Sequence, residues 1–245
     1  MTFGIDYWNV EIKDPIQPKS EIQVLSDPNT FKNFIYRFDP VKGDNDPGGF
    51  NFPVAGSQNK DFPIAYVYLP YDNNGKFYAS GVDFSSQYRF KSSVGTFGVN
   101  FDGALVVTHG YQYAGGAKVS DLGKFKDFGA QPRWRHSLSG SWSTGMFDAV
   151  LTNNYTHSYD DYTDPAAVNT TDYPAQRTVK AYVTWDAQFA IKPTKSLTLT
   201  AGIKNLLDQD PPSSRNSLYF QTGYDATYAN PIGRQFYGRI NYKFF

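Results

Sequence analysis

Apolar and polar residues alternate along much of the chain, which is the pattern of a β-strand whose two faces meet different surroundings. Residues 179–191 show it most clearly, because Trp185 and Phe189 share one face while Asp186 and Gln188 share the other. The same alternation recurs along the chain and predicts eight strands. They are expected at about residues 3–13, 77–91, 96–112, 131–143, 146–159, 178–192, 196–207 and 232–244.

The connections between these strands alternate strictly between long and short. Short connections are expected at residues 91–95, 143–145 and 192–195, and long ones at 14–76, 113–130, 160–177 and 208–231. Successive antiparallel strands run in opposite directions, so all tight turns lie at one end of the sheet and all long loops at the other. Outer-membrane β-barrels have this asymmetry, whereas soluble β-sandwiches carry long loops at both ends. The pattern therefore favours an all-β, antiparallel transmembrane barrel.

Mean hydropathy, at −0.51, would by itself indicate a soluble protein. No apolar run reaches the roughly 18 residues that a membrane helix needs. A membrane strand needs only about 9–11 residues with every second one apolar, so the low hydropathy does not exclude a barrel. Aromatic residues make up 18% of the chain, and they favour strands.

Charge and residue types exclude several classes of function. Lys+Arg and Asp+Glu are 23 each, so the basic excess of a nucleic-acid-binding protein is missing. There is no cysteine to form a disulfide or a thiolate metal site. The histidines His109, His136 and His157 lack the spacing of metal ligands, and His136 is interpreted as an interfacial residue on the face of Trp142. We therefore expect no catalytic residue, no metal site and no cofactor, and hence no enzyme.

Two sets of side chains in the loops and at the strand ends have alternative interpretations. The acidic clusters Asp44/Asp46 and Asp160/Asp161/Asp164 supply oxygen ligands that calcium accepts, but their spacing is not that of an EF-hand. Solvated loop carboxylates are the favoured interpretation. Aromatic residues at strand ends are expected at the boundaries between lipid and water. They are Tyr111, Tyr113, Trp134, Trp142, Tyr155 and Tyr159.

The long connection at residues 14–76 is expected to contain a short helix capped by Ser20, with an apolar stripe that Pro28 interrupts. Residues 39–50 are rich in Gly, Pro and Asp and predict an irregular loop. Residues 7–10 of the preceding strand fit neither face, which indicates a bulge.

The end of the chain carries recognisable motifs. They are LTLTAGIKNLLDQDPP at residues 197–212 and GYDATYANPIGRQFYGRINYKFF at residues 223–245. Both resemble the C-terminal part of TonB-dependent receptors, in which Asn-Leu-x-Asp ends the penultimate strand and an aromatic residue ends the last one. Segments 4–16 and 79–90 also resemble strands of this family. The matching residues are Asn205, Leu206, Asp208, Pro211, Pro212, Tyr224, Asp225, Tyr228, Pro231, Gly233 and Arg234.

This resemblance implies that residues 1–245 form one partial barrel domain, about the last eight strands of a 22-strand barrel that encloses a plug. Residues 1–15 lack the basic start and apolar core of a signal peptide. The chain is therefore expected to be a fragment that lacks the plug and the first strands. The implied location is the outer membrane of a Gram-negative bacterium, and the implied function is import of a scarce ligand such as a siderophore, cobalamin or a saccharide.

The resemblance also implies partners and site residues. The expected partners are outer-membrane lipid, the missing strands and plug, the TonB complex reached through the missing region, the barrel-assembly machinery and a small ligand. The expected assembly signal is Tyr242, Phe244 and Phe245, in which Phe244 lies in the alternating frame and Phe245 extends it. Loop aromatics expected to contact ligand are Tyr219, Phe220, Tyr224 and Tyr228.

Two alternatives remain open at this point. One is a complete, closed eight-strand barrel with a structural or enzymatic role, whose interior would be filled by side chains. The other is a soluble, secreted, carbohydrate-binding sandwich, in which apolar faces would meet in a core. The strands' polar face is rich in small side chains, which suits a wide lumen better than a filled one.

Overall fold

The computed structural model describes most of the chain. The described residues are 1–19, 21–37, 54–55, 64–73, 75–113, 116–126, 128–163, 177–215 and 223–244. Several predictions therefore fall outside the described part, and they remain predictions. They concern the Ser20 cap, the loop at residues 39–50, Asp44, Asp46, Asp164, Tyr219, Phe220 and Phe245.

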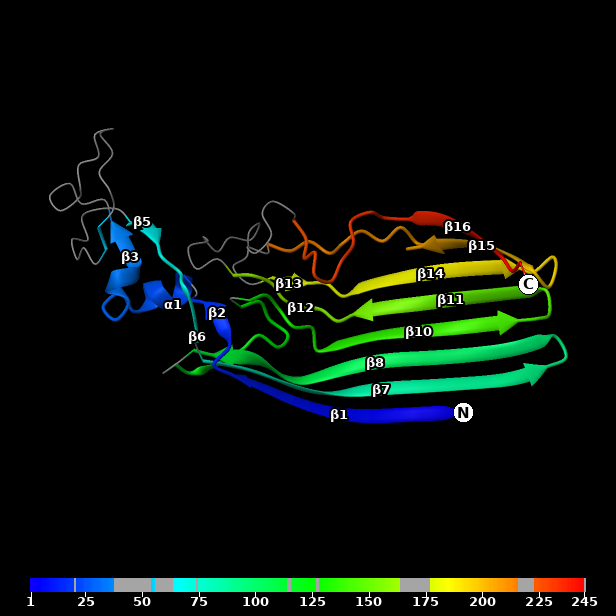
Figure 1. Ribbon diagram of the computed structural model, residues 1–245, viewed down its shortest axis with the longest axis horizontal. Coiled ribbons are helices and arrows are strands. Elements are labelled where there is room, and N and C mark those ends of the chain that lie inside the picture. Colours follow the sequence, from blue (N-terminus) through cyan, green and yellow to red (C-terminus); the bar gives the residue numbers. More distant parts are fainter. Residues whose placement is uncertain are drawn as a thin grey trace, which may run out of the picture. The chain divides into compact units, whose positions relative to one another are not determined.

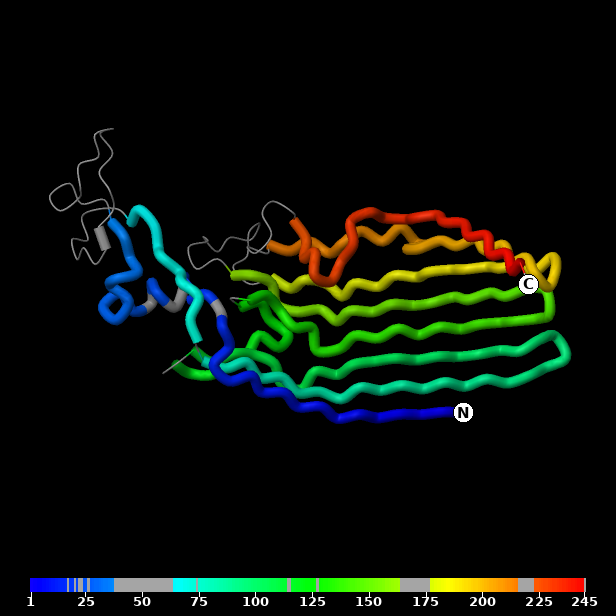
Figure 2. The backbone as a smooth tube through the Cα atoms, in the orientation of Figure 1, coloured from blue at the N-terminus to red at the C-terminus, as the bar shows by residue number. Residues whose placement is uncertain are grey.

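The eight predicted strands are confirmed. They form one sheet in the order β1-β7-β8-β10-β11-β14-β15-β16, and the short β9 (Lys118–Ser120) also pairs with β8. Figure 2 shows the chain crossing this sheet in sequence order, from blue β1 to red β16. The strands are β1 (Thr2–Lys13), β7 (Lys76–Ser92), β8 (Gly95–Gln112), β10 (Trp134–Ser143), β11 (Phe147–Thr156), β14 (Tyr182–Ile191), β15 (Leu197–Lys204) and β16 (Gln235–Tyr242).

The asymmetry of the connections is also confirmed. Tight turns join β7 to β8, β10 to β11 and β14 to β15, and Figure 1 shows them at the end of the sheet where β1 begins and β16 ends. At the opposite end, two predicted strands are interrupted. Residues 157–158 separate β11 from β12 (Tyr159–Asp160), and residues 180–181 separate β13 (Thr178–Val179) from β14. β12 and β13 pair with each other as a separate ribbon.

The register divides the sheet into an apolar face and a polar face. One row of paired residues crosses six strands and is apolar throughout: Val99, Gly140, Leu151, Ala187, Ile203 and Phe236. The neighbouring row crosses four strands and is polar throughout: Asn100, Ser139, Thr152 and Asp186. Because side chains alternate between faces along a strand, these rows lie on opposite sides of the sheet.

Side-chain contacts agree with this division. On the polar face, Asn154 Nδ2 donates a hydrogen bond to Asp186 (3.1 Å), and the Tyr237 hydroxyl donates to Gln188 (3.0 Å). On the apolar face, Phe84 contacts Trp134 with ring centroids 6.0 Å apart. Trp8 of β1 lies on the polar face, where its Nε1 donates to Asp83 (3.2 Å). The bulge expected at residues 7–10 stays a prediction.

The apolar face lies open over the described part of the chain. Leu151 is 45% exposed and Phe189 is 47% exposed, although both lie in the middle of the sheet. The buried apolar residues lie mostly in the connections, among them Phe125 and Tyr159. The sandwich alternative is therefore wrong, because it requires the apolar faces to meet in a core. The closed eight-strand alternative is wrong as well, since β1 and β16 are the two ends of the sheet order.

The connection between β1 and β7 forms a small unit of its own. The predicted short helix is present as α1 (Glu21–Ser26), followed by a 3₁₀ turn at Lys32–Phe34. Val24 and Ile35 are buried apolar residues among those of this unit that the structure describes. Two small sheets complete it: β2 (Ile16–Pro18) with β6 (Tyr71–Asn73), and β3 (Ile35–Arg37) between β4 (Val54–Ala55) and β5 (Ile64–Val67). Among the described residues, no helix has both the length and the apolar character to span a membrane.

The two faces should respond differently to one added charge. Leu151→Lys places an ammonium group on the apolar face, whereas Thr152→Lys places it on the polar face one residue away. A lysine facing the middle of a bilayer costs about 2–4 kcal/mol, and one facing a lumen costs little. We expect Leu151→Lys to lower the fraction of the protein that folds in lipid bilayers, as measured by heat-modifiability on gels, and Thr152→Lys to leave it unchanged. Equal effects of the two substitutions would contradict the assignment of the faces.

Candidate functional site

The residues of the family motif lie where β15 ends. Asn205 has a positive φ of 51°, a conformation that asparagine tolerates better than most residues. Its side chain closes the turn, because Oδ1 accepts the backbone N–H of Gln209 and Nδ2 donates to the Gln209 carbonyl, both at 2.9 Å. The backbone N–H of Asn205 donates to Asp186 (2.8 Å), so this turn is attached to the polar face of β14.

Asp208 connects that turn to the segment that leads into β16. Its Oδ1 accepts the backbone N–H of Arg234 at 2.7 Å. Gly233 has a φ of 72°, and a Cβ at this position would lie 3.0 Å from the same carboxylate oxygen. Glycine is therefore the residue that fits. Asn205, Leu206, Asp208, Gly233 and Arg234 thus form a tie between the last two strands, while Pro211 lies half-buried nearby.

A second cluster holds the connections together at the same end. Phe125, Ala130, Tyr159 and Val179 form a buried apolar group, with Tyr162 and Tyr228 packed against it. The Tyr159 hydroxyl donates to Asp225 at 2.6 Å. Burial raises the pKa of Tyr159, and the neighbouring Asp225 carboxylate raises it further. Tyr159 therefore stays neutral and donates its hydroxyl proton to the hydrogen bond with Asp225.

Asp161 binds a different segment in the same cluster. One of its carboxylate oxygens accepts the Ser214 hydroxyl (2.7 Å), and the other accepts the backbone N–H of Arg215 (2.9 Å). Its Oδ1 also accepts the N–H of Tyr162 (2.9 Å). Asp161 is 3% exposed, so its interpretation as a solvated loop carboxylate is wrong, and its oxygens hold neighbouring segments instead. Among the described residues, no group of three or more His, Cys, Asp or Glu side chains is arranged to hold a metal.

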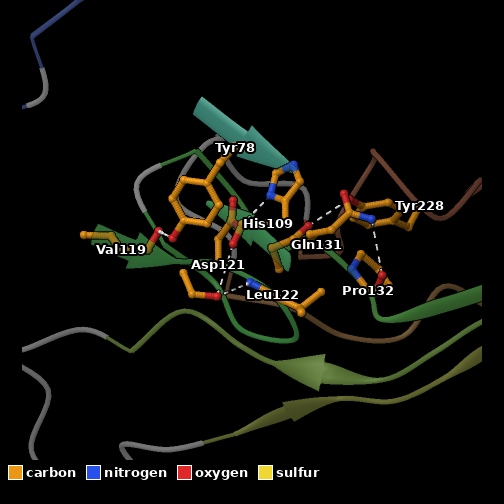
Figure 3. Close-up of polar contacts among 10 residues, drawn as sticks. Tyr78, His109, Val119, Asp121, Leu122, Gln131, Pro132 and Tyr228 are labelled. Carbon is orange, nitrogen blue, oxygen red and sulfur yellow. Dashed lines mark hydrogen bonds and ion pairs between the residues drawn. The ribbon is translucent and has the colours of Figure 1, made fainter. Parts of the chain in front are cut away.

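Histidine and aspartate also meet at the end of β8, in the cluster drawn in Figure 3. His109 Nδ1 lies 2.6 Å from Asp121 Oδ1, and the Tyr78 hydroxyl donates to the carbonyl of Val119 (2.9 Å). The hydroxyl of the nearby Ser120 donates to the backbone carbonyl of His109 and not to its ring. The pair therefore lacks the serine contact of a hydrolytic triad. It attaches β9 and the following loop to β8.

The predicted ligand-contacting aromatics that the structure describes are Tyr224 and Tyr228, and both lie half-buried in loops. Tyr228 packs edge-on against Tyr159 with ring centroids 6.1 Å apart, and its hydroxyl donates to the carbonyl of Ala130 (2.8 Å). These contacts give Tyr228 a structural role. Of the predicted boundary aromatics, Tyr111 and Tyr159 are buried, at 2% and 4% exposure, whereas Trp134, Trp142 and Tyr155 lie on the apolar face.

An aromatic surface that the sequence analysis missed lies in the unit between β1 and β7. Tyr36 and Tyr66 are directly paired, and their rings stack with centroids 4.4 Å apart and planes 14° apart. Phe34 and Tyr68 form the next stacked pair, at 6.4 Å and 15°. The side chain of Ile35 points the other way, into the core. We call Phe34, Tyr36, Tyr66 and Tyr68 the aromatic platform. The sequence does indicate this surface, because in each of the two segments the aromatic residues are two positions apart, which places them on the same face of a strand.

The polar face carries a pocket of about 530 Å³ between β1, β7, β8, β10 and β11. Asp6, Asp83, Asp102, Arg135 and Asn154 are among the residues that line it. Charged and amide side chains at this position present hydrogen-bonding groups to water and to polar solutes. The polar face can therefore line an aqueous path.

Comparison with known proteins places this architecture in a family. Residues 2–206 match the family model described as TonB dependent receptor-like, beta-barrel. No curated protein sequence matches the chain. The fold resembles a mutant of the ferric enterobactin receptor PfeA from Pseudomonas aeruginosa in complex with enterobactin, with a TM-score of 0.60, 15% identity and coverage of 98% of this chain and 29% of that one.

The siderophore receptor PirA from Acinetobacter baumannii is similar as well. Its TM-score is 0.57 at 13% identity, again with coverage of 98% of this chain and 29% of that one. At such low identities the likeness establishes the fold alone, and the chain spans less than a third of either receptor. The chain belongs to the TonB-dependent receptor family and forms a C-terminal portion of its β-barrel domain.

Proposed function

We propose that this chain forms part of the wall and the extracellular loops of an importer in the outer membrane of a Gram-negative bacterium. The family consists of outer-membrane transporters, not enzymes. The observation that carries the proposal is the pair of neighbouring rows, in which an apolar row crosses six strands beside a polar row. Such a sheet separates hydrocarbon from an aqueous lumen.

The open ends of the sheet support the same proposal. β1 and β16 are the first and last strands in the sheet order, and each has one edge without a neighbour in this sheet. In hydrocarbon an unpaired backbone N–H or C=O costs several kcal/mol. The remaining strands of the receptor would pair with these edges and close the barrel. A plug domain of the same receptor and the TonB complex would then supply gating and energy.

The aromatic platform supports capture of a ligand at the cell surface. Tyr66 and Tyr68 are 47% and 53% exposed and present ring faces on the side of their sheet opposite Ile35. Ring faces bind flat or ring-bearing molecules through stacking and apolar contact. The two similar receptors are named for ferric enterobactin and for a siderophore. We therefore propose a ferric siderophore as the ligand, with cobalamin and saccharides as the alternatives.

The platform can be tested by removing its exposed rings. We expect Tyr66→Ala/Tyr68→Ala to weaken binding of the transported ligand about thirtyfold, because each of the two lost ring contacts contributes on the order of 1 kcal/mol. Tyr71→Ala is the matched control, since Tyr71 is also exposed but lies in β6. Binding and uptake are measured with ferric enterobactin, other ferric siderophores, cobalamin and maltodextrins, on cells that lack their other receptors for these compounds.

If the cells take up only a saccharide or only cobalamin, that compound is the ligand and the proposal of a siderophore is wrong. Equal affinity of the double variant and the Tyr71→Ala control would contradict a role for the platform. Uptake of none of these probes by a correctly folded receptor would contradict the proposed substrate classes.

The end of β16 is proposed to be the assembly signal. Tyr242 and Phe244 are exposed, and their rings meet edge-on with centroids 5.1 Å apart. Recognition by strand addition would use the backbone for affinity and alternate side chains for register. We expect removal of Phe244 and Phe245 together to reduce insertion of the receptor, and removal of Phe245 alone to have a smaller effect. Surface-protease and heat-modifiability assays measure insertion, and full insertion of the double truncation would contradict the proposal.

A further inference from the structure

Four ring side chains lie together on the apolar face, at the end of β10 and β11 away from the tight turns. His136 is paired with Tyr155 across the two strands. The backbone N–H of His157 donates to the carbonyl of Trp134 (2.9 Å), so these two residues form the next cross-strand contact. Trp134, His136, Tyr155 and His157 are half-buried, and we call them the ring quartet.

Hydrogen bonds and stacking link the four rings in a chain. Trp134 Nε1 donates to His136 Nδ1 at 2.8 Å, and the His136 ring stacks on Tyr155 with centroids 5.1 Å apart and planes 11° apart. The Tyr155 hydroxyl lies 3.0 Å from His157 Nδ1. In both histidines Nδ1 is therefore the nitrogen that faces another member of the quartet.

This geometry fixes the tautomer of His136. An indole N–H donates a hydrogen bond and cannot accept one, so His136 Nδ1 must accept. Neutral His136 then carries its proton on Nε2. Within the described part of the chain, neither His136 Nε2 nor His157 Nε2 has a hydrogen-bond partner. The quartet thus presents a fixed N–H donor on a face that is otherwise largely apolar.

The quartet lies at one boundary of the apolar band. Trp142 is at the other end of β10 on the same face, where its Nε1 donates to the carbonyl of Val94 in a tight turn. The eight residue-to-residue steps from Trp134 to Trp142 cover about 27 Å along the strand, or about 20 Å of height if the strand is tilted by about 40°. The apolar band of an outer-membrane barrel is about 25 Å tall. With Trp142 at one boundary, Trp134 and the neighbouring His157 lie about 5 Å inside the other, so the quartet lies next to the lipid headgroups.

We propose that the ring quartet binds the phosphate group of a lipid in the outer leaflet. The inference rests on the proposed function, in which the apolar face meets lipid. The ring quartet is continuous with the apolar face, so the molecule that contacts it is a lipid. The rings of Trp134 and Tyr155 contact the upper part of the acyl chains. The Nε2–H group of His136 donates to a phosphate oxygen, which is a strong acceptor and carries negative charge. His157 donates through Nε2 in the same way when the Tyr155 hydroxyl donates to its Nδ1.

The test compares lipid binding by the intact receptor and its variants. His136→Phe/His157→Phe keeps two rings and removes both donors. His136→Gln/His157→Gln keeps an N–H donor near the position of Nε2. Tyr88→Phe is the control, because it removes a polar group from the exposed Tyr88 near the tight turns. Native mass spectrometry measures how much phosphatidylglycerol, and how much phosphate-free digalactosyl diacylglycerol, each purified receptor retains.

We expect the Phe variant to bind phosphatidylglycerol at least tenfold more weakly than wild type, and the Gln variant and Tyr88→Phe to stay within about threefold of it. Retention of the phosphate-free lipid should be the same in all variants. Unchanged phosphatidylglycerol binding by the Phe variant, or an equal loss of both lipids, would overturn the inference. Displacement of the lipid by millimolar inorganic phosphate would overturn it in favour of a free-anion site.

Heat-modifiability and ligand uptake are measured on the same preparations. A wild-type receptor that does not insert into vesicles would contradict the proposed function itself. A wild-type receptor that inserts and transports, with lipid binding indifferent to the histidines, would overturn only the inference about the quartet. If the Phe variant does not fold, the single variants His136→Phe and His157→Phe carry the comparison, each expected to weaken phosphatidylglycerol binding at least threefold.

Discussion

The strand register is the constraint on which the rest of this structure depends. A backbone in hydrocarbon must pair every N–H and C=O, and a shift of one residue would turn every side chain to the wrong face. Here each pairing from β8 to β16 keeps Leu151, Phe189 and their neighbours on one face and Thr152 and Asp186 on the other. The tight turns set this register at one end, and the tie between Asp208 and Arg234 sets it at the other.

The connections are stabilised differently from the strands, because they lie in water and outside the main sheet. They are held by small buried clusters, such as Tyr159 with Asp225 and Asp161 with Ser214. The family motif around Asn205 and Asp208 is part of this scaffold as well. Exposed aromatic surface is concentrated elsewhere, in the aromatic platform and on the apolar face.

The alternation of apolar and polar residues was enough to predict the strands, because each strand is long enough to show several repeats of it. It was not enough for the platform, since β3 and β5 have only three and four residues and are far apart in sequence. The family motif gave the position of Tyr228 but not its packing against Tyr159, which depends on contact between two loops. The hydrogen bond between Trp134 and His136 depends on side-chain geometry that no pattern encodes.

The central claim is that the two faces of this sheet meet lipid and water. It is tested most directly by single cysteines along β11 of the intact receptor, because this chain has no native cysteine to interfere. Cysteines replacing Ala149, Val150, Leu151 and Thr152 are labelled in turn with a membrane-impermeant maleimide. The account predicts labelling at Val150 and Thr152 and protection at Ala149 and Leu151. Uniform labelling, or the reverse alternation, would contradict it.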